Sequence, residues 1–391
     1  MIVKIGDNII SSLGFSSREN FQAVQAGKTG LKRYENLFNL PEPFIASMID
    51  RERLNDEFPA ICGKEKAYPA TDLEKAAILS VYYANEAAGI DLSGNRVLFI
   101  LSTTKGNVDL LEKFPQRFVF LWHSASVTAR YFNNPNTPAV VSNACISGAA
   151  AQIAALREIE SGNCDYAVVV GAEMLSKFII SGFQSFKALS PEICRPFAAG
   201  RTGLNLGEAV ATIVYAKAGI EKKSKSGLIK GAVRNDANHI SGPSRTAEGS
   251  FRALQNILHG VEKEDIAFIN AHGTATPYND AMEAVALRRA GLDATPVNSL
   301  KSLFGHTLGA CGVLESIISM YAHDSNLILP VKDFGKDETF SFGNEQFKLN
   351  IPRTISPSGK PFFIKMLSGF GGCNAALLFG SGLTRSYSEK R

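Results

Sequence analysis

The feature that most constrains the fold of this chain is an alternation between apolar runs and helical patterns. The runs, which we predict to be strands, are NRVLFILST (95–103), PAVVSN (138–143), YAVVVGAE (166–173), AVATIVYA (209–216), IAFINAHG (266–273) and AALLFGSG (375–382). Near-continuous apolar runs are typical of strands that are buried on both faces. The helices that we predict between several of them cover residues 72–89, 280–291 and 312–323. This alternation predicts an α/β protein whose sheets are covered by helices.

Two short segments, one in each half of the chain, have similar sequence patterns. Residues 207–219 read GEAVATIVYAKAG and residues 371–382 read GGCNAALLFGSG, so each places small residues before an apolar run that closes on glycine. A Lys- and Ser-rich stretch, AKAGIEKKSKSG (216–227), lies slightly past the middle of the chain. We therefore predict an internal duplication, with one half over residues 1–222 and the other over residues 223–391.

Composition narrows the classes of function. The chain has 391 residues, of which 45% are hydrophobic and 20% charged, which is enough for one large core or two fused cores. It has no apolar run of the roughly 18 residues that a membrane span needs, and its N-terminus lacks the features of a signal peptide. The net charge is +4, without a block of basic residues, and the six cysteines are scattered without a C-x-x-C pair. We expect a cytoplasmic protein with reduced thiols, no metal, no disulfide framework, and neither nucleic acid nor membrane as a partner.

Cys145 is the candidate nucleophile because of its position between a predicted strand and a predicted helix. The apolar run from Ala139 precedes it, and SGAAAQIAALREIESG (147–162) follows as a helix that closes at Gly162. The positive end of a helix dipole favours thiolate, so we expect the pKa of this thiol to be lowered. Taken alone, Cys145 could equally be a buried structural cysteine.

Two histidines occupy matching positions in the second half. His272 follows the predicted strand in FINAHGTATPYNDAMEAVALRR (268–289), and His306 lies in the turn of VNSLKSLFGHTLGACGVLESI (297–317). Ligand crevices of α/β proteins form at such strand ends. Each histidine alone could be a hydrogen-bonded core residue. Together with Cys145 they form a Cys/His/His set that predicts nucleophilic catalysis.

Six motifs of the chain resemble those of the β-ketoacyl-acyl carrier protein synthases. They are NACISGA (143–149), RPFAAGRTGLNLGEA (195–209), NDANHI (235–240), NAHGTATP (270–277), NSLKSLFGHTLGA (298–310) and SGFGGCNAALLF (368–379). This family consists of decarboxylating condensing enzymes of fatty acid and polyketide synthesis, within the thiolase superfamily. The resemblance implies the thiolase fold, with two similar α/β halves in a layered α-β-α-β-α architecture. It also implies an acyl carrier protein as partner and a homodimer, or a heterodimer with a related subunit.

The resemblance assigns a role to each candidate catalytic residue. Cys145 would accept an acyl group from the carrier's phosphopantetheine, so the enzyme would need no cofactor of its own. His272 and His306 would stabilise the enolate that forms when a malonyl unit loses CO2, and its attack on acyl-Cys145 would give a 3-oxoacyl-carrier protein. The N–H groups of Cys145 and Phe370 would bind the oxyanion, and Phe370 would gate the acyl tunnel. Lys301 would lie at the site, paired with Glu283, for which a solvated helix-face position is the alternative.

The resemblance also implies contacts with the carrier. Thr274 and Thr276 match positions that contact the pantetheine arm, although turn residues of this kind can also cap a helix. Arg201 matches a position that meets the acidic carrier protein, and we expect Lys64 and Lys66 beside it. For all three cations, solvated surface charges are the alternative.

The chain departs from the family pattern in several places. The usual opening strand looks abbreviated, Ala198 and Thr202 stand where the family has aspartates, and Ser368 stands where phenylalanine is common. Fatty acid synthesis and a specialised polyketide or aryl-polyene pathway remain open. Two other functions are weighed: a thiolase-fold acyltransferase without decarboxylative elongation, and a chain-length partner subunit. The first lacks the Gly-His turn that follows Lys301 here, and the second usually lacks the nucleophile that Cys145 supplies.

Overall fold

The computed structural model describes residues 1–62, 71–111, 115–219, 226–238, 242, 244–335, 340–342 and 345–381. Lys64, Lys66 and the predicted boundary between residues 222 and 223 lie outside this part of the chain. None of the described helices is long and apolar enough to cross a membrane.

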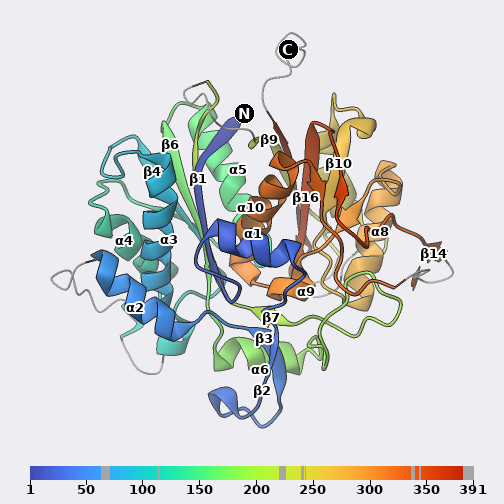
Figure 1. Cartoon of the computed structure of the whole chain (residues 1–391), viewed down its shortest axis with the longest axis horizontal. Coiled ribbons are helices and arrows are strands. Elements are labelled where there is room, and N and C mark those ends of the chain that lie inside the picture. Colours follow the sequence, from blue (N-terminus) through green and yellow to red (C-terminus); the bar gives the residue numbers. More distant parts are fainter. Residues whose placement is uncertain are drawn as a thin grey trace.

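Two groups of five strands make up the central sheet (Figure 1). The first group consists of β1 (Ile2–Ser11), β8 (Ala209–Lys217), β6 (Tyr166–Glu173), β4 (Val97–Ser102) and β5 (Ala139–Val141), in spatial order. The second consists of β9 (Ser226–Asn235), β17 (Cys373–Ser381), β16 (Phe362–Gly369), β10 (Ile266–Asn270) and β11 (Val297–Asn298). In both groups the successive pairings are antiparallel, antiparallel, parallel and parallel. The same order and directions occur twice, as a duplicated unit would give.

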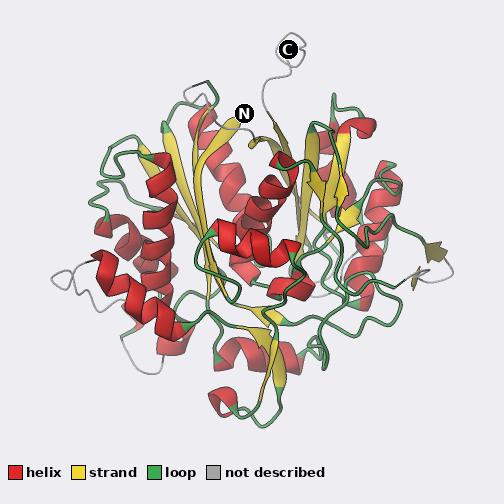
Figure 2. Cartoon of the chain, viewed as in Figure 1, coloured by secondary structure: helices red, strands yellow, loops and turns green. Residues whose placement is uncertain are grey.

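Helices fill the space between the two groups of strands and cover their outer faces. In the middle lie α5 (Ser147–Glu160) and α10 (Cys311–Asp324), and both pack into one apolar core with the inner faces of the strands (Figure 2). Outside the first group lie α3 (Asp72–Ala88) and α4 (Leu121–Tyr131), and outside the second lie α7 (Glu248–Leu258) and α8 (Pro277–Ala290). This α-β-α-β-α layering confirms the predicted thiolase fold.

Small residues allow the two central helices to approach each other closely. A Cβ atom on Gly312 would lie 2.5 Å from the backbone nitrogen of Ala149, so only glycine fits there. The amide of Gln152 bridges the contact by donating to the carbonyl of Gly312 at 2.9 Å. The alanine- and glycine-rich start of α5, which follows Cys145, is therefore explained by close helix packing.

The expectation of an abbreviated opening strand was wrong. β1 spans ten residues and pairs with β8 from Ile2 to Ser11. Its sequence, IVKIGDNIIS, carries polar residues within the apolar run, which weakened the pattern. Lys4 and Asp7 form an ion pair at 2.6 Å, and Asn8 is buried, so these polar residues are accommodated within the fold.

Candidate active site

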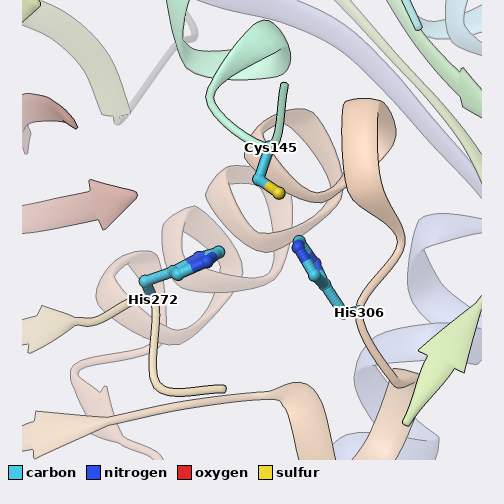
Figure 3. Close-up of side chains that lie close together, drawn as sticks. All are labelled: Cys145, His272 and His306. Carbon is cyan, nitrogen blue, oxygen red and sulfur yellow. The ribbon is translucent and has the colours of Figure 1, made fainter. Parts of the chain in front are cut away.

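Three turns bring Cys145, His272 and His306 together from both halves of the chain (Figure 3). Cys145 lies between β5 and α5, His272 follows β10, and His306 lies between α9 (Lys301–Phe304) and α10. All three side chains are buried, and their sulfur and ring nitrogen atoms lie within 4.8 Å of one another. The structure therefore unites the Cys/His/His set that the sequence predicts.

Backbone contacts fix His306 against the first half of the chain. Its N–H donates to the carbonyl of Asn205 at 2.7 Å, and its carbonyl accepts from Gly207 at 3.0 Å. The preceding Gly305 has a φ of 69°, and a Cβ atom there would lie 2.4 Å from the carbonyl oxygen of Leu206. Glycine is thus required for the Gly-His turn to reach the site.

The two imidazole rings are neutral and available to a ligand. Their centroids lie 5.0 Å apart at an interplanar angle of 83°. Within the described part of the chain, Nδ1 of His272 and both ring nitrogens of His306 are buried without a hydrogen-bond partner. Burial, followed by the nearby Lys301 ammonium, lowers the pKa of both rings well below its usual range. Each neutral ring offers one N–H donor.

The thiol of Cys145 differs from the expectation of a lowered pKa. Burial raises its pKa to about 11, although Lys301, Lys105 and the backbone N–H of Phe370 favour the thiolate. The N-cap residue of α5 is Ile146, so Cys145 lies just outside the helix. Ala144, directly before Cys145, has a φ of 44°, which shows that the turn is strained. Loss of solvation outweighs the interactions that favour the thiolate, so Cys145 is a protonated thiol before substrate binds.

Alkylation of Cys145 should therefore depend steeply on pH. Because only the thiolate reacts, the rate with iodoacetamide should keep rising from about pH 7 to about pH 10, close to tenfold per unit. Peptide mapping by mass spectrometry measures this rate, with the partly exposed Cys373 of the same protein as internal reference. A plateau near neutral pH would instead show that the start of α5 stabilises the thiolate.

A buried group of three charges lies beside the rings. The ammonium of Lys301 lies 2.5 Å from Oε1 of Glu315, and the ammonium of Lys365 contacts Oε2 of the same carboxylate. The three side chains are at most 2% exposed. Sequence analysis missed Glu315 and Lys365; the available signal was a lone charge within an apolar run, in GVLESIISM (312–320) and in FFIKML (362–367).

Glu283 does not pair with Lys301, which corrects the expected pairing. Its carboxylate accepts the backbone N–H groups of His272 and Gly273, both at 2.7 Å, and the side-chain amide of Asn279 at 3.1 Å. Burial raises the pKa of Glu283 to about 7. The second turn of α8 directs this side chain back onto the turn after β10, whereas α10 supplies the partner of Lys301. Glu283 thereby fixes the backbone of the His272 turn.

A cavity of about 1420 Å³ opens onto the three residues. Its lining includes Thr274, Thr276 and Phe370. The two threonine hydroxyls lie 3.0 Å apart, and Thr276, the N-cap residue of α8, makes no side-chain capping hydrogen bond. The helix-capping alternative is therefore wrong for Thr276, and both hydroxyls lie where a ligand in the cavity can reach them.

Phe370 lies at the edge of this cavity in an aromatic group. Its ring stacks on Phe183 with centroids 6.0 Å apart and meets the edge of Phe186 at 5.7 Å. The residue is 42% exposed, and the glycines at 371 and 372 have φ angles of 85° and 73°. Gly369, just before it, approaches the backbone nitrogen of Cys145, where a Cβ atom would lie 3.1 Å away. This close approach places the Phe370 backbone beside the thiol.

Arg201 is a partly buried loop residue whose side chain turns into the protein, contrary to its expected role in docking. Its side chain is 6% exposed, and its guanidinium donates to the carbonyls of Ala198, Thr276 and Pro277 at 3.1, 3.4 and 2.8 Å. Asp280, 3.9 Å away, compensates part of its charge. A guanidinium bound to these carbonyls stabilises the turn that carries the threonines, which argues against a role in carrier docking.

The donor set formed by Cys145 and the two histidines resembles a transition-metal site. The buried charges beside it argue against this use. Lys301 and Lys365 share the single carboxylate of Glu315, which leaves a surplus positive charge that repels a divalent cation. The geometry fits acyl-transfer chemistry better than metal binding.

Comparisons with known proteins agree with this geometry. Residues 64–218 match the family model described as β-ketoacyl synthase, N-terminal domain, and residues 227–334 match its C-terminal domain. The 3-oxoacyl-[acyl-carrier-protein] synthase 2 of Coxiella burnetii is 30% identical over 96% of this chain and 97% of its own length. The chain belongs to the β-ketoacyl synthase family. It is therefore an acyltransferase of the condensing type.

Solved β-ketoacyl synthases share the fold. A β-ketoacyl synthase from Burkholderia phymatum superposes with a TM-score of 0.86 over 98% of this chain and 99% of its own, at 24% identity, which supports the fold alone. A ketosynthase in complex with its chain length factor from Xenorhabdus doucetiae superposes with a TM-score of 0.82. It is 25% identical, and the match covers 97% of this chain and 98% of that one.

Proposed function

We propose that this β-ketoacyl synthase transfers an acyl group to Cys145 and condenses it with a malonyl-carrier protein, releasing CO2 and a 3-oxoacyl-carrier protein. One observation carries the proposal: a thiol and two neutral, unpartnered imidazoles converge at a cavity that holds Cys145 at its lining. This arrangement provides a nucleophile and two oxyanion donors, which the reaction requires together.

In the first step the sulfur of Cys145 attacks the acyl thioester of the carrier. A carbon–sulfur bond to Cys145 forms, the bond to the pantetheine sulfur breaks, and the thiol proton passes to that departing sulfur. The carbonyl oxygen becomes an oxyanion, which the N–H groups of Cys145 and Phe370 would bind. Because the resting thiol has a raised pKa, this oxyanion stabilisation, rather than a preformed thiolate, drives the step.

In the second step a malonyl thioester loses CO2 and leaves an enolate. The negative charge develops on the thioester oxygen, which can accept one N–H from each of His272 and His306. The enolate carbon then attacks the carbonyl of acyl-Cys145, the bond to the Cys145 sulfur breaks, and the departing thiolate takes up a proton from solvent, as its raised pKa favours. Neutral rings suit this role, because a protonated ring would give up its proton to the enolate.

The charges that line the cavity support an acidic carrier protein as partner. The basic residues of the lining are Lys187, Arg245, Arg288 and Arg289, against the acids Asp236 and Glu248. Asp236 accepts backbone N–H groups from Ser244 and Gly249, and Glu248 pairs with Arg289. The excess of cations complements an acidic partner whose pantetheine arm would pass Thr274 and Thr276. These residues replace Arg201 in the proposed docking surface.

We further propose that the chain works as the nucleophile-bearing subunit of a homodimer or of a heterodimer. The edge strand β5 packs on α4, and Phe120 and Trp122 at the start of α4 are 48% and 54% exposed. Exposed aromatic residues beside a sheet edge are typical of an interface between subunits. The related ketosynthase from Xenorhabdus doucetiae forms a complex with a chain length factor.

A reconstituted assay tests the proposed reaction. The purified chain would be incubated with an acyl-carrier protein and malonyl-carrier protein, and intact-protein mass spectrometry would follow both carriers and the enzyme. We expect an acyl adduct on Cys145 and a 3-oxoacyl-carrier product longer by two carbons. Acylation without elongation would contradict the condensing function and favour a simple acyltransferase. If the chain acts only in a heterodimer, addition of the related subunit should restore elongation.

A further inference from the structure

Lys365 is a buried charge that the proposed mechanism leaves without a role. It lies in β16 and is fully buried, and an ammonium ion in such a place is costly unless acceptors compensate it. Its Nζ contacts two oxygens: Oε2 of Glu315 and, at 3.2 Å, the carbonyl oxygen of Ala271. Burial lowers the pKa of Lys365, and the adjacent carboxylate of Glu315 opposes this shift. A carboxylate in direct contact favours the charged form, so we treat the nitrogen as an ammonium donor to both oxygens. Ala271 directly precedes His272.

Lys365 changes the charge balance of the site. Without it, Lys301 and Glu315 would form a neutral pair; with it, two ammonium groups share one carboxylate and the sum is +1. All three side chains are shielded from water, so solvent and salt screen this charge weakly. The charge acts on both rings: burial and then Lys301 and Lys365 lower the pKa of His306, and the same causes, with His306 in addition, lower that of His272.

We propose that Lys365 is a positioning residue for the two histidines: it braces the carbonyl before His272 and maintains a surplus positive charge beside both rings. The inference rests on the proposed function, in which neutral rings hold an enolate. A surplus cation opposes protonation of either ring and favours the negative charge of the enolate. Glu283 accepts the N–H groups of His272 and Gly273, and Lys365 donates to the carbonyl of Ala271. The turn is therefore held by hydrogen bonds at both its N–H and its carbonyl groups.

The other charged or titratable groups that face the rings do not supply this surplus. In the described part of the chain the groups around the rings include Cys145 before α5, Glu173 on β6, Glu283 on α8, Lys301 on α9, and Cys311 and Glu315 on α10. Burial raises the pKa of Glu173, so it loses its negative charge as the pH falls. The thiols are neutral, because burial raises the pKa of both. Glu283, with a pKa raised to about 7, loses its negative charge in the acidic range where the rings would gain protons. Lys365 therefore leaves an uncompensated cation in that range.

The test compares the ring titrations of the wild-type protein with those of K365M and K365Q. Neither variant has the positive charge. K365Q keeps an amide N–H that can donate to the carbonyl of Ala271, so it separates the effect of the charge from the effect of this hydrogen bond. Nitrogen-15 NMR of labelled histidine reads the protonation of each ring, with assignments from H272N and H306N. In both variants we expect the midpoints of His272 and His306 to rise by about one pH unit or more. The acidic limb of malonyl-thioester decarboxylation should move in the same direction.

Two controls make the result specific. K4M removes another lysine of the sheet, which is 12% exposed and paired with Asp7, and it should leave both ring titrations unchanged. K365R keeps the charge and should retain the wild-type midpoints. Unchanged midpoints in K365Q would overturn the role of Lys365, even in an active synthase, because the titration needs no turnover. Shifted midpoints in a protein that does not condense its substrates would count against the proposed function instead.

Discussion

Cys145→Ala should abolish condensation, with a loss of about 10³-fold or more, while Cys145→Gln should still decarboxylate malonyl thioester. Alanine removes the sulfur that lies with the ring nitrogens of His272 and His306 at the cavity, so no acyl group can be held beside the enolate. The decarboxylation step requires only the two rings, and neither substitution changes them. Release of CO2 from malonyl-carrier protein and formation of 3-oxoacyl product, measured in parallel, distinguish the two half-reactions.

A buried cysteine outside the cavity provides the matched control. Cys164 is also shielded, with a pKa that burial raises to about 11, but it is not part of the cavity lining. Cys164→Ala should retain condensation and acyl transfer. If Cys145→Ala still formed 3-oxoacyl product, or if an acyl adduct appeared on Cys164 or Cys373, Cys145 would not be the nucleophile.

Local patterns in the sequence predicted many of the helices and strands. The apolar run at 166–173 and the helix over 72–89 correspond to β6 and to α3 (Asp72–Ala88), because burial on both faces and helix capping leave direct traces in the sequence. The capping box of Thr71 and Glu74 and the left-handed Gly89 mark the ends of α3. The strand ends at Cys145 and His272 could be placed for the same reason.

Pairings between distant residues could not be predicted in this way. Glu315 lies closer in sequence to Lys301 than Lys365 does, but nothing in the sequence shows that both lysines share its carboxylate. Glu283 follows His272 by eleven residues, and only the direction of α8 decides that it meets backbone N–H groups instead of Lys301. Charge partners inside a core depend on how helices cross, which local periodicity does not contain.

Burial of individual side chains was the other source of error. Arg201 has the residue type and the motif of a docking cation, yet three carbonyls enclose its guanidinium. Cys145 stands next to a helix start, yet the loss of solvation on burial determines the pKa of its thiol. In both residues the sequence identifies the functional group, and the three-dimensional environment determines its chemical state.

Replacing His272 or His306 by alanine should lower malonyl decarboxylation by about 10²-fold or more, which is the usual loss when one oxyanion donor is removed. Each neutral ring can donate one N–H to the enolate oxygen. Among the described residues, Nδ1 of His272 and both ring nitrogens of His306 have no hydrogen-bond partner. Acyl transfer to Cys145 should fall much less, because its oxyanion is bound by backbone N–H groups. The two rates would be measured separately, by CO2 release and by the mass of the acylated enzyme.

The comparison with a third histidine separates chemistry from stability. His323 on α10 is buried as well, and its Nε2 lies 3.1 Å from the carbonyl oxygen of Lys360, away from the cavity. His323→Ala should lose stability through its packing on Phe363 but keep the decarboxylation rate of the folded protein. If His306→Ala instead lowered acyl transfer and decarboxylation equally, His306 would act as a general base on the thiol of Cys145. The raised pKa of that thiol makes this alternative chemically meaningful, and a parallel measurement of the two half-reactions decides between the two roles.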